Sequence, residues 1–167
     1  WQTGSFSDIY VVSTKDGKRT KVVENLRGNT YLSPKGEYVL WYNRENQNWY
    51  SYDIAAGKTV QLNKDLSVSF SDEDNDSPDT PGSYGISGWT DTKVWINDKY
   101  DIWSFNLDGS AATKLTNGRD QKVTFRYDMW KEKKSRRSPN IIDESKQMVL
   151  SAFNNVNKQS GFYSLTF

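Results

Sequence analysis

A hairpin pattern that occurs three times constrains the fold of this chain more than any other feature of the sequence. Its copies read DIYVVSTKDGKRTKVVENL from Asp8, NWYSYDIAAGKTVQLNKDL from Asn48 and DIWSFNLDGSAATKLTNGR from Asp101. Each copy has a short run of alternating apolar residues, a turn that contains glycine, and a second run that ends near a leucine; the turn glycines are Gly17, Gly57 and Gly109. An apolar period of two predicts β-strands, and glycine between two such runs predicts a turn. The sequence therefore predicts three copies of one β-hairpin.

Further strand-like segments lie beside these hairpins. GEYVLWYNRE precedes the second copy, TKVWIND precedes the third, and residues 147–166 repeat the strand, the polar turn and the aromatic strand once more. The hairpins start at residues 8, 48 and 101. These intervals are close to the period of about 40–50 residues that four-stranded propeller blades have, with a longer loop in the second interval.

We therefore expect an all-β fold, namely a partial β-propeller of about three to four blades, each a four-stranded antiparallel sheet. The predicted propeller segment covers 1–167, with a blade hairpin at 8–26, blades at 29–63 and 84–116, and a partial blade at 122–167. Because blades bury their faces against neighbouring blades, both ends of such an arc need cover. The alternative is a self-contained sandwich or sheet of about 13 strands, which the length of the repeat disfavours.

Composition excludes several kinds of catalysis. The chain has no histidine and no cysteine, so it holds no Ser-His-Asp or Cys-His relay, no metal bound through those residues and no disulfide. A net charge of +1 gives no field that would attract nucleic acid. No apolar run approaches the roughly 20 residues of a membrane span. We expect no catalytic residue, no cofactor, no nucleic-acid partner and no membrane span.

The stretch SDEDNDSPDTPGSYGISGWTD, residues 71–91, is the strongest candidate for a site. Asp72, Asp74 and Asp76 have the i, i+2, i+4 spacing of carboxylates in calcium loops, which makes them metal candidates. An EF-hand loop would also need Gly at its sixth position and Glu at its twelfth, where this chain has Ser77 and Ser83. The sequence therefore favours a solvated connection without a metal.

A contact role is the alternative for this stretch. The carboxylates could attract a basic peptide or pair with an arginine of another domain, and the residues concerned are Asp72, Glu73, Asp74 and Asp76. Trp89, which follows the acidic run, is a further candidate for contact with a ligand or a domain.

Three other groups of residues have structural interpretations. The basic run WKEKKSRR, residues 130–137, is interpreted as a solvated loop. Most of five tryptophans recur at equivalent places in the repeat, which predicts packing between blades; the five are Trp41, Trp49, Trp89, Trp95 and Trp103. Glycoside hydrolysis needs a pair of carboxylates, and the sequence indicates no such pair among the aspartates at strand ends and turns. These are Asp53, Asp91, Asp98, Asp101 and Asp108.

Several segments together resemble one protein family. They are YLSPKGEYVLWYN, YSYDIAAGKTVQL, DEDNDSPDTPGSYGISGWT, DKYDIWSFNLDG, KLTNGRD and LSAFNNVNKQSGFY, and they cover roughly residues 30–165. In this order they resemble the N-terminal β-propeller of secreted prolyl-oligopeptidase-family serine peptidases of Bacteroides-type bacteria. The short segment DTKVWIND and the insertion WKEKKSRRSP depart from that pattern.

The resemblance implies a larger protein in which a C-terminal α/β-hydrolase domain follows the propeller. The catalytic serine, aspartate and histidine belong to that domain, and none of them maps onto this sequence, which has no GxSxG motif. The resemblance implies a non-catalytic segment that gates or positions a peptide substrate in a periplasmic or extracellular enzyme. Because the chain opens on Trp1, we expect any signal peptide to have been removed.

A second function stays open at this point. SPxG followed by a strand with the Y-D pair also occurs in other propellers, including the translocation protein of the Tol-Pal system. The alternative is therefore a stand-alone periplasmic propeller that acts as a protein-interaction module.

Overall fold

The computed structural model describes residues 4–127 and 139–167, and within these ranges the chain forms strands, turns and loops but no helix. The strands are β1 (Ser7–Val12), β2 (Arg19–Leu26), β3 (Thr30–Leu32), β4 (Tyr38–Asn43), β5 (Asn48–Asp53), β6 (Lys58–Gln61), β7 (Ile86–Trp89), β8 (Lys93–Asn97), β9 (Ile102–Asn106), β10 (Ala112–Lys114), β11 (Val123–Arg126), β12 (Met148–Asn154) and β13 (Ser160–Leu165). The expected all-β fold is confirmed. In the described ranges no helix has the length and apolar character that crossing a membrane requires. The basic run at 130–137 lies outside the described residues.

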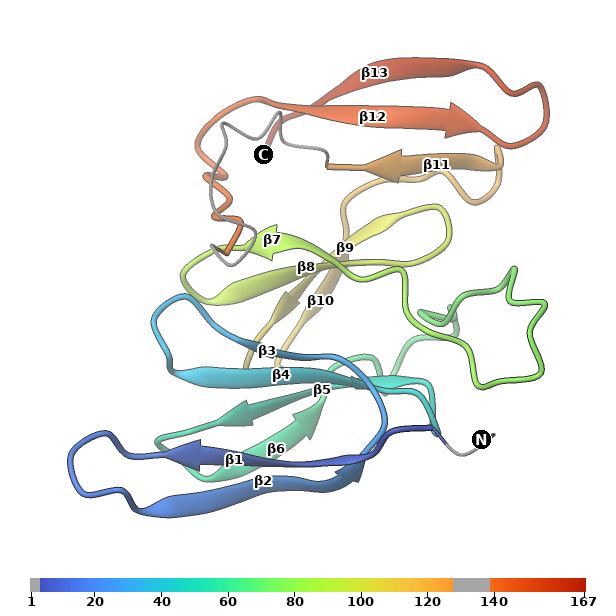
Figure 1. Cartoon of the computed structure of the whole chain (residues 1–167). Coiled ribbons are helices and arrows are strands. Elements are labelled where there is room, and N and C mark those ends of the chain that lie inside the picture. The colour runs from blue at the N-terminus through green and yellow to red at the C-terminus, as the bar shows by residue number, and fades with distance from the viewer. Residues whose placement is uncertain (1–3, 128–138) are drawn as a thin grey trace.

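Four antiparallel sheets follow one another in the order of the chain (Figure 1). The first sheet is the hairpin β1-β2, the second has the order β3-β4-β5-β6, the third β7-β8-β9-β10, and the fourth β11-β12-β13. Strands within each sheet pair with their neighbours in sequence, so each sheet is an up-and-down meander. The second and third sheets lie inside the ranges 29–63 and 84–116, while the blade boundaries themselves stay a prediction.

The repeated turns are built on glycine, as the sequence predicts. Gly17, Gly57 and Gly109 have φ angles of 72°, 64° and 74°, in the left-handed region that glycine enters without the steric cost of a side chain. Each closes its turn by donating its N–H to a carbonyl three or four residues earlier. Glycine therefore sets the connection between the two strands of each hairpin copy.

Apolar clusters between successive sheets form the core. We call the side of a sheet that meets the next sheet along the chain its forward face, and the other side its backward face. Side chains alternate between the two faces of a strand, so residues two apart share a face. The first cluster joins the forward face of the second sheet to the backward face of the third, and includes Leu40, Tyr42 and Trp49 with Val94, Ile96 and Phe105.

Two further clusters repeat this arrangement. Trp95 and Ile102, on the forward face of the third sheet, pack with Met148 and Leu150 of the fourth. The first sheet meets the second in the same way, through Ile9 and Val11 packed against Val39, Trp41 and Tyr52. The sheets are therefore stacked in one direction, each forward face on the following backward face (Figure 1).

The five tryptophans for which packing was predicted all lie in these layers. Trp49 and Trp89 belong to the cluster between the second and third sheets, with Trp103 packed against it; Trp95 and Trp41 belong to the clusters on either side. Large rings thus fill the space between sheets, where the burial of their apolar surface stabilises the fold.

The chain returns to the third sheet before β12 begins. Asn140 accepts a hydrogen bond through its backbone carbonyl from the N–H of Trp89 at 2.8 Å, and Ile142 donates its N–H to the Trp89 carbonyl at 2.7 Å. Gly88 permits this close approach, because a Cβ at that position would lie 2.8 Å from the Asn140 carbonyl oxygen. The segment that leads into β12 is therefore fixed to β7 by backbone hydrogen bonds, as a short parallel bridge between Trp89 and Ile141.

Candidate functional site

The acidic loop, residues 71–83, forms a closed excursion between β6 and β7. Ser71 and Ser83 form an antiparallel bridge at its base, and Asp72 donates its N–H to the Gly82 carbonyl at 2.7 Å. Just past the bridge, the Tyr84 hydroxyl accepts the N–H of Glu73 at 2.8 Å. These bonds fix the loop at its base, and its carboxylates are presented from a folded turn.

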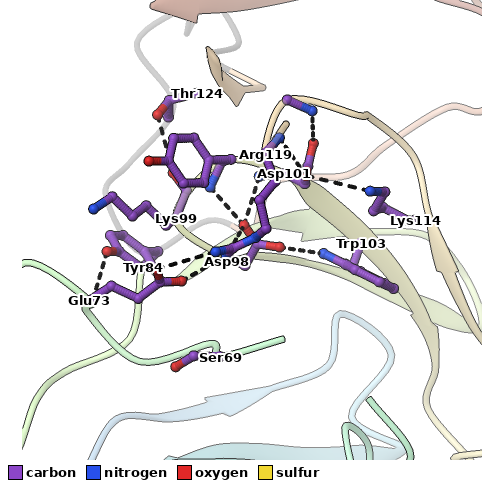
Figure 2. Close-up of polar contacts among 12 residues, drawn as sticks. Ser69, Glu73, Tyr84, Asp98, Lys99, Asp101, Trp103, Lys114, Arg119 and Thr124 are labelled. Atoms are coloured by element: carbon purple, nitrogen blue, oxygen red, sulfur yellow. Dashed lines mark hydrogen bonds and ion pairs between the residues drawn. The ribbon is translucent and has the colours of Figure 1, made fainter. Parts of the chain in front are cut away.

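Two loop carboxylates bind cations of the turn between β8 and β9 and of the segment after β10, and Figure 2 shows the pair of Glu73 with Arg119. Glu73 accepts two bonds from the guanidinium of Arg119, at 3.2 and 2.7 Å. Asp74 lies 2.5 Å from the Nζ of Lys99. Arg119 and Lys99 both also lie near the ring of Tyr100, at 5.1 and 5.6 Å from its centroid. A bidentate arginine pair is the stronger of such contacts and holds a defined geometry.

A third loop carboxylate, that of Asp79, pairs with two arginines. Arg27 lies between β2 and β3, and Arg44 directly follows β4. Asp79 lies 2.6 Å from Nη2 of Arg27 and 3.5 Å from Nη2 of Arg44. Arg27 also donates to the hydroxyl of Thr80 at 3.2 Å. The bond from Arg27 is the main reason that the pKa of Asp79 lies below its usual value. The loop thus contacts segments that precede and follow it in the chain, and it bridges the second and third sheets.

Below Arg119 lies Asp98, whose side chain is fully buried. One carboxylate oxygen accepts the backbone N–H groups of Tyr100 and Asp101 at 2.7 and 2.9 Å, together with Nη2 of Arg119 at 3.3 Å. Its second oxygen accepts the indole N–H of Trp103 at 2.7 Å. Burial of a charge is tolerated where paired charge and hydrogen bonds replace the lost water, and Asp98 has both.

Asp101, the first residue of the third hairpin copy, is buried beside it. Its carboxylate accepts the hydroxyl of Thr116 at 2.8 Å and the N–H of Gly118 at 2.5 Å, and Lys114 lies 3.8 Å away. Thr116 in turn accepts the N–H of Ile102 at 3.0 Å. The carboxylate therefore ties the start of the hairpin to the segment that follows its end.

The same polar closure occurs in the other two copies. Asn48 accepts the side-chain N–H of Asn63 at 3.0 Å, and Asp8 accepts the N–H of Asn25 at 2.9 Å. Each copy thus starts with a polar residue, Asp8, Asn48 or Asp101, for which the sequence alone indicates no partner. That repeated position was the available signal for Asp101, while Asp98, Arg119, Lys99 and Arg27 carried no comparable signal.

The geometry separates the predicted candidates from one another. Asp74 and Glu73 are paired with Lys99 and Arg119, whereas Asp72 accepts the N–H of Asp74 at 3.0 Å within the loop itself. Asp76 lies exposed at the loop tip. Across residues 4–127 and 139–167, no three acidic side chains come together as a group that could hold a metal ion. Trp89 is buried at 2% exposure in the core cluster, away from the loop carboxylates that sequence reasoning grouped with it.

Chemically, the network can hold a loop in place. The buried carboxylate of Asp98 accepts hydrogen bonds from backbone, indole and guanidinium groups, and the same guanidinium, that of Arg119, also binds Glu73 of the loop. Networks of this kind favour one conformation, since a buried carboxylate would be costly to leave without these donors. We therefore interpret the Glu73, Asp98, Asp101 and Arg119 network as a positioning device for the acidic loop.

Acid is expected to loosen this loop. Because the pKa of Asp79 is lower than its ordinary value of 3.8, its pairing with Arg27 stabilises the folded state above that value and is lost as the pH falls through the lowered pKa. We expect hydrogen-exchange protection of the loop amides, corrected for intrinsic rates, to fall several-fold between about pH 5 and about pH 3. Asp79→Asn should show the low protection already at neutral pH and a weaker pH dependence. Protection that is unchanged by both acid and the substitution would contradict this role.

No model of a known protein family matches the chain, and no curated protein matches it either. We therefore infer the function from the family resemblance of the sequence segments and from the geometry of the described residues.

Proposed function

We propose that the chain is an arc of a β-propeller without catalytic residues, which gates or positions a peptide substrate for a hydrolase domain outside residues 1–167. The parent protein in this proposal is a prolyl-oligopeptidase-like serine peptidase of the periplasm or cell exterior. The observation that carries the propeller is the one-directional stacking of four meander sheets in chain order. Radial repetition of such sheets is the way in which propellers bury both faces of each blade.

The composition of the chain supports the proposal that the catalytic residues lie in a separate domain. Neither histidine nor cysteine occurs anywhere in the sequence, so the relay of a serine peptidase has to be supplied by another segment. The buried carboxylates Asp98 and Asp101 are engaged with hydrogen-bond donors of the fold. The stacked sheets are compatible with a gating role, which needs no reacting group from this chain.

Within this proposal the acidic loop has a structural role. Glu73, Asp74 and Asp79 are paired with Arg119, Lys99 and Arg27 of the same chain, which weakens their attraction for a basic peptide or another domain. The tip residue Asp76 is the loop carboxylate best placed for an external contact, since it is exposed.

An activity-based probe tests the proposal. A fluorophosphonate should label a single serine in the natural polypeptide that contains this chain, and the labelled serine should lie after Phe167 in a GxSxG motif. The 167-residue chain alone should neither be labelled nor hydrolyse proline-containing peptides. Turnover by that chain, blocked by a serine-directed inhibitor, would contradict the proposal.

The same experiment distinguishes the peptidase proposal from the alternative, a stand-alone propeller that acts as a protein-interaction module. If the reading frame ends soon after the sheets are complete and no serine reacts, the peptidase proposal fails and a stand-alone interaction module replaces it. A labelled serine after Phe167 combined with export of the protein would support the peptidase and its periplasmic or extracellular location.

A further inference from the structure

One position of the repeat is buried in two sheets and exposed in the last. The third strands β5, β9 and β13 carry Trp49, Ile102 and Phe162 at equivalent places, each directly opposite the corresponding residue of the second strand. Trp49 and Ile102 are 0% exposed, whereas Phe162 is 75% exposed. An aromatic ring is therefore presented to solvent at the point where the other sheets place core residues.

Phe162 belongs to a wider apolar face. Val149 and Phe153, on the same side of β12, are 58% and 39% exposed, and the counterparts of Val149 are the fully buried Leu40 and Trp95. The face is hollowed into a groove of about 450 Å³, whose lining includes Thr124, Arg126, Ser151, Phe153 and Phe162. Exposed apolar surface that is contiguous and concave marks an interaction site more strongly than scattered apolar residues do.

The three interfaces within the chain show what covers such a face. In each of them the cover is the backward face of the next sheet, with apolar residues from both its second and its third strand. These residues include Val39, Trp41 and Tyr52 in the second sheet, Val94, Ile96 and Phe105 in the third, and Met148, Leu150 and Leu165 in the fourth. The forward face of the fourth sheet continues this series.

A second copy of the chain is the poorer occupant. Its exposed backward face, on the first sheet, presents Tyr10 and Val12, and their partners across the sheet are the cations Lys21 and Arg19. These cations would face the side of the fourth sheet that carries Arg126. Two apolar residues beside like charges offer less than the apolar residues from two strands that cover each face within the chain.

We infer that the forward face of the fourth sheet binds a further antiparallel β-sheet, supplied by a polypeptide segment outside residues 1–167. That sheet presents apolar side chains from its second and third strands, and it covers Val149, Phe153 and Phe162. The inference rests on the proposed propeller arc and identifies the surface through which the arc continues.

A single cysteine tests this surface, because the sequence has no cysteine of its own. In the 167-residue chain, the thiol introduced by Phe162→Cys should react with a maleimide at the rate of an exposed thiol. In the natural polypeptide, with the residues that follow Phe167 present, we expect the rate to fall about tenfold or more, because buried thiols are inert. Val156→Cys, in the exposed turn between β12 and β13, is the matched control and should react alike in both forms.

Three results would overturn the inference. Equal reactivity of the Phe162→Cys thiol in the two forms would mean that no sheet covers the face, and a natural polypeptide without further residues would have the same meaning. Slow reaction in the 167-residue chain that recovers on dilution would identify a second copy as the occupant. Protection of the thiol in the natural polypeptide without a labelled serine would instead leave this inference intact and remove the peptidase proposal.

Discussion

Asp98→Ala is expected to destabilise the chain by about 3–5 kcal/mol, the cost of removing one partner from a buried charge pair. The substitution leaves Arg119 without one of its two carboxylates and leaves the indole N–H of Trp103 and two backbone N–H groups without an acceptor. For a domain of this size the melting temperature should fall by roughly 10 °C. Thermal unfolding followed by circular dichroism measures the effect.

Two variants control for the removal of an aspartate. Asp91→Ala eliminates an exposed carboxylate that pairs with Lys35 at the surface, and should change stability by no more than about 0.5 kcal/mol. Asp98→Asn keeps the shape of the side chain but loses the charge opposite Arg119, and its effect should lie between the other two. If Asp98→Ala cost no more than Asp91→Ala, the network around Arg119 would not stabilise the fold.

Trp49→Ala is expected to have an effect of similar size, about 3–5 kcal/mol, for a different reason. The Trp49 side chain is fully buried between the second and third sheets, where it packs against Tyr42 and Tyr31 with ring centroids 5.4 and 6.1 Å away. Its indole N–H has no hydrogen-bond partner among the described residues, so the loss is one of packing and apolar burial. The free energy of unfolding from urea denaturation measures it.

The equivalent position of the fourth sheet provides the control. Phe162→Ala in the 167-residue chain should change stability by no more than about 0.5 kcal/mol, because Phe162 is exposed there. The loss of stability on truncation to alanine at this repeat position should therefore be large where another sheet covers the face, as at Trp49, and small where none does, as at Phe162. Equal costs at the two positions would mean that Phe162 is already buried in solution.

The hairpins were predictable because their determinants are local. Alternation in NWYSYD and the left-handed turn at Gly57 act within a few residues, and the structure has β5 and β6 on either side of that turn. The packing of Trp49 and Trp95 between sheets was predicted and is found, although the equivalent residues in the repeat are Ile102 for Trp49 and Leu40 for Trp95. Because the same hairpin pattern occurs in each repeat, the all-β class could be predicted without knowing which distant residues are in contact.

The acidic loop was found in the sequence, but its role was not. The spacing of Asp72, Asp74 and Asp76 suggested ligands for one cation, whereas the structure directs Asp74 to Lys99 and leaves Asp76 exposed. The pairs of Asp79 with Arg27 and of Glu73 with Arg119 join residues 52 and 46 positions apart. No local pattern encodes such pairs, since the partners meet only after the sheets have stacked.

Local sequence thus specified the strands, the glycine turns and the hydrophobic residues available for burial, because backbone sterics and side-chain alternation act over neighbouring residues. Stacking of the sheets specified which of those residues are covered. Phe162 and Trp49 look alike in the repeat, yet one is exposed and the other buried, since a sheet face is buried only where another sheet lies against it. The same stacking brings Arg27, Lys99 and Arg119 around the acidic loop and makes it a bridge between two sheets.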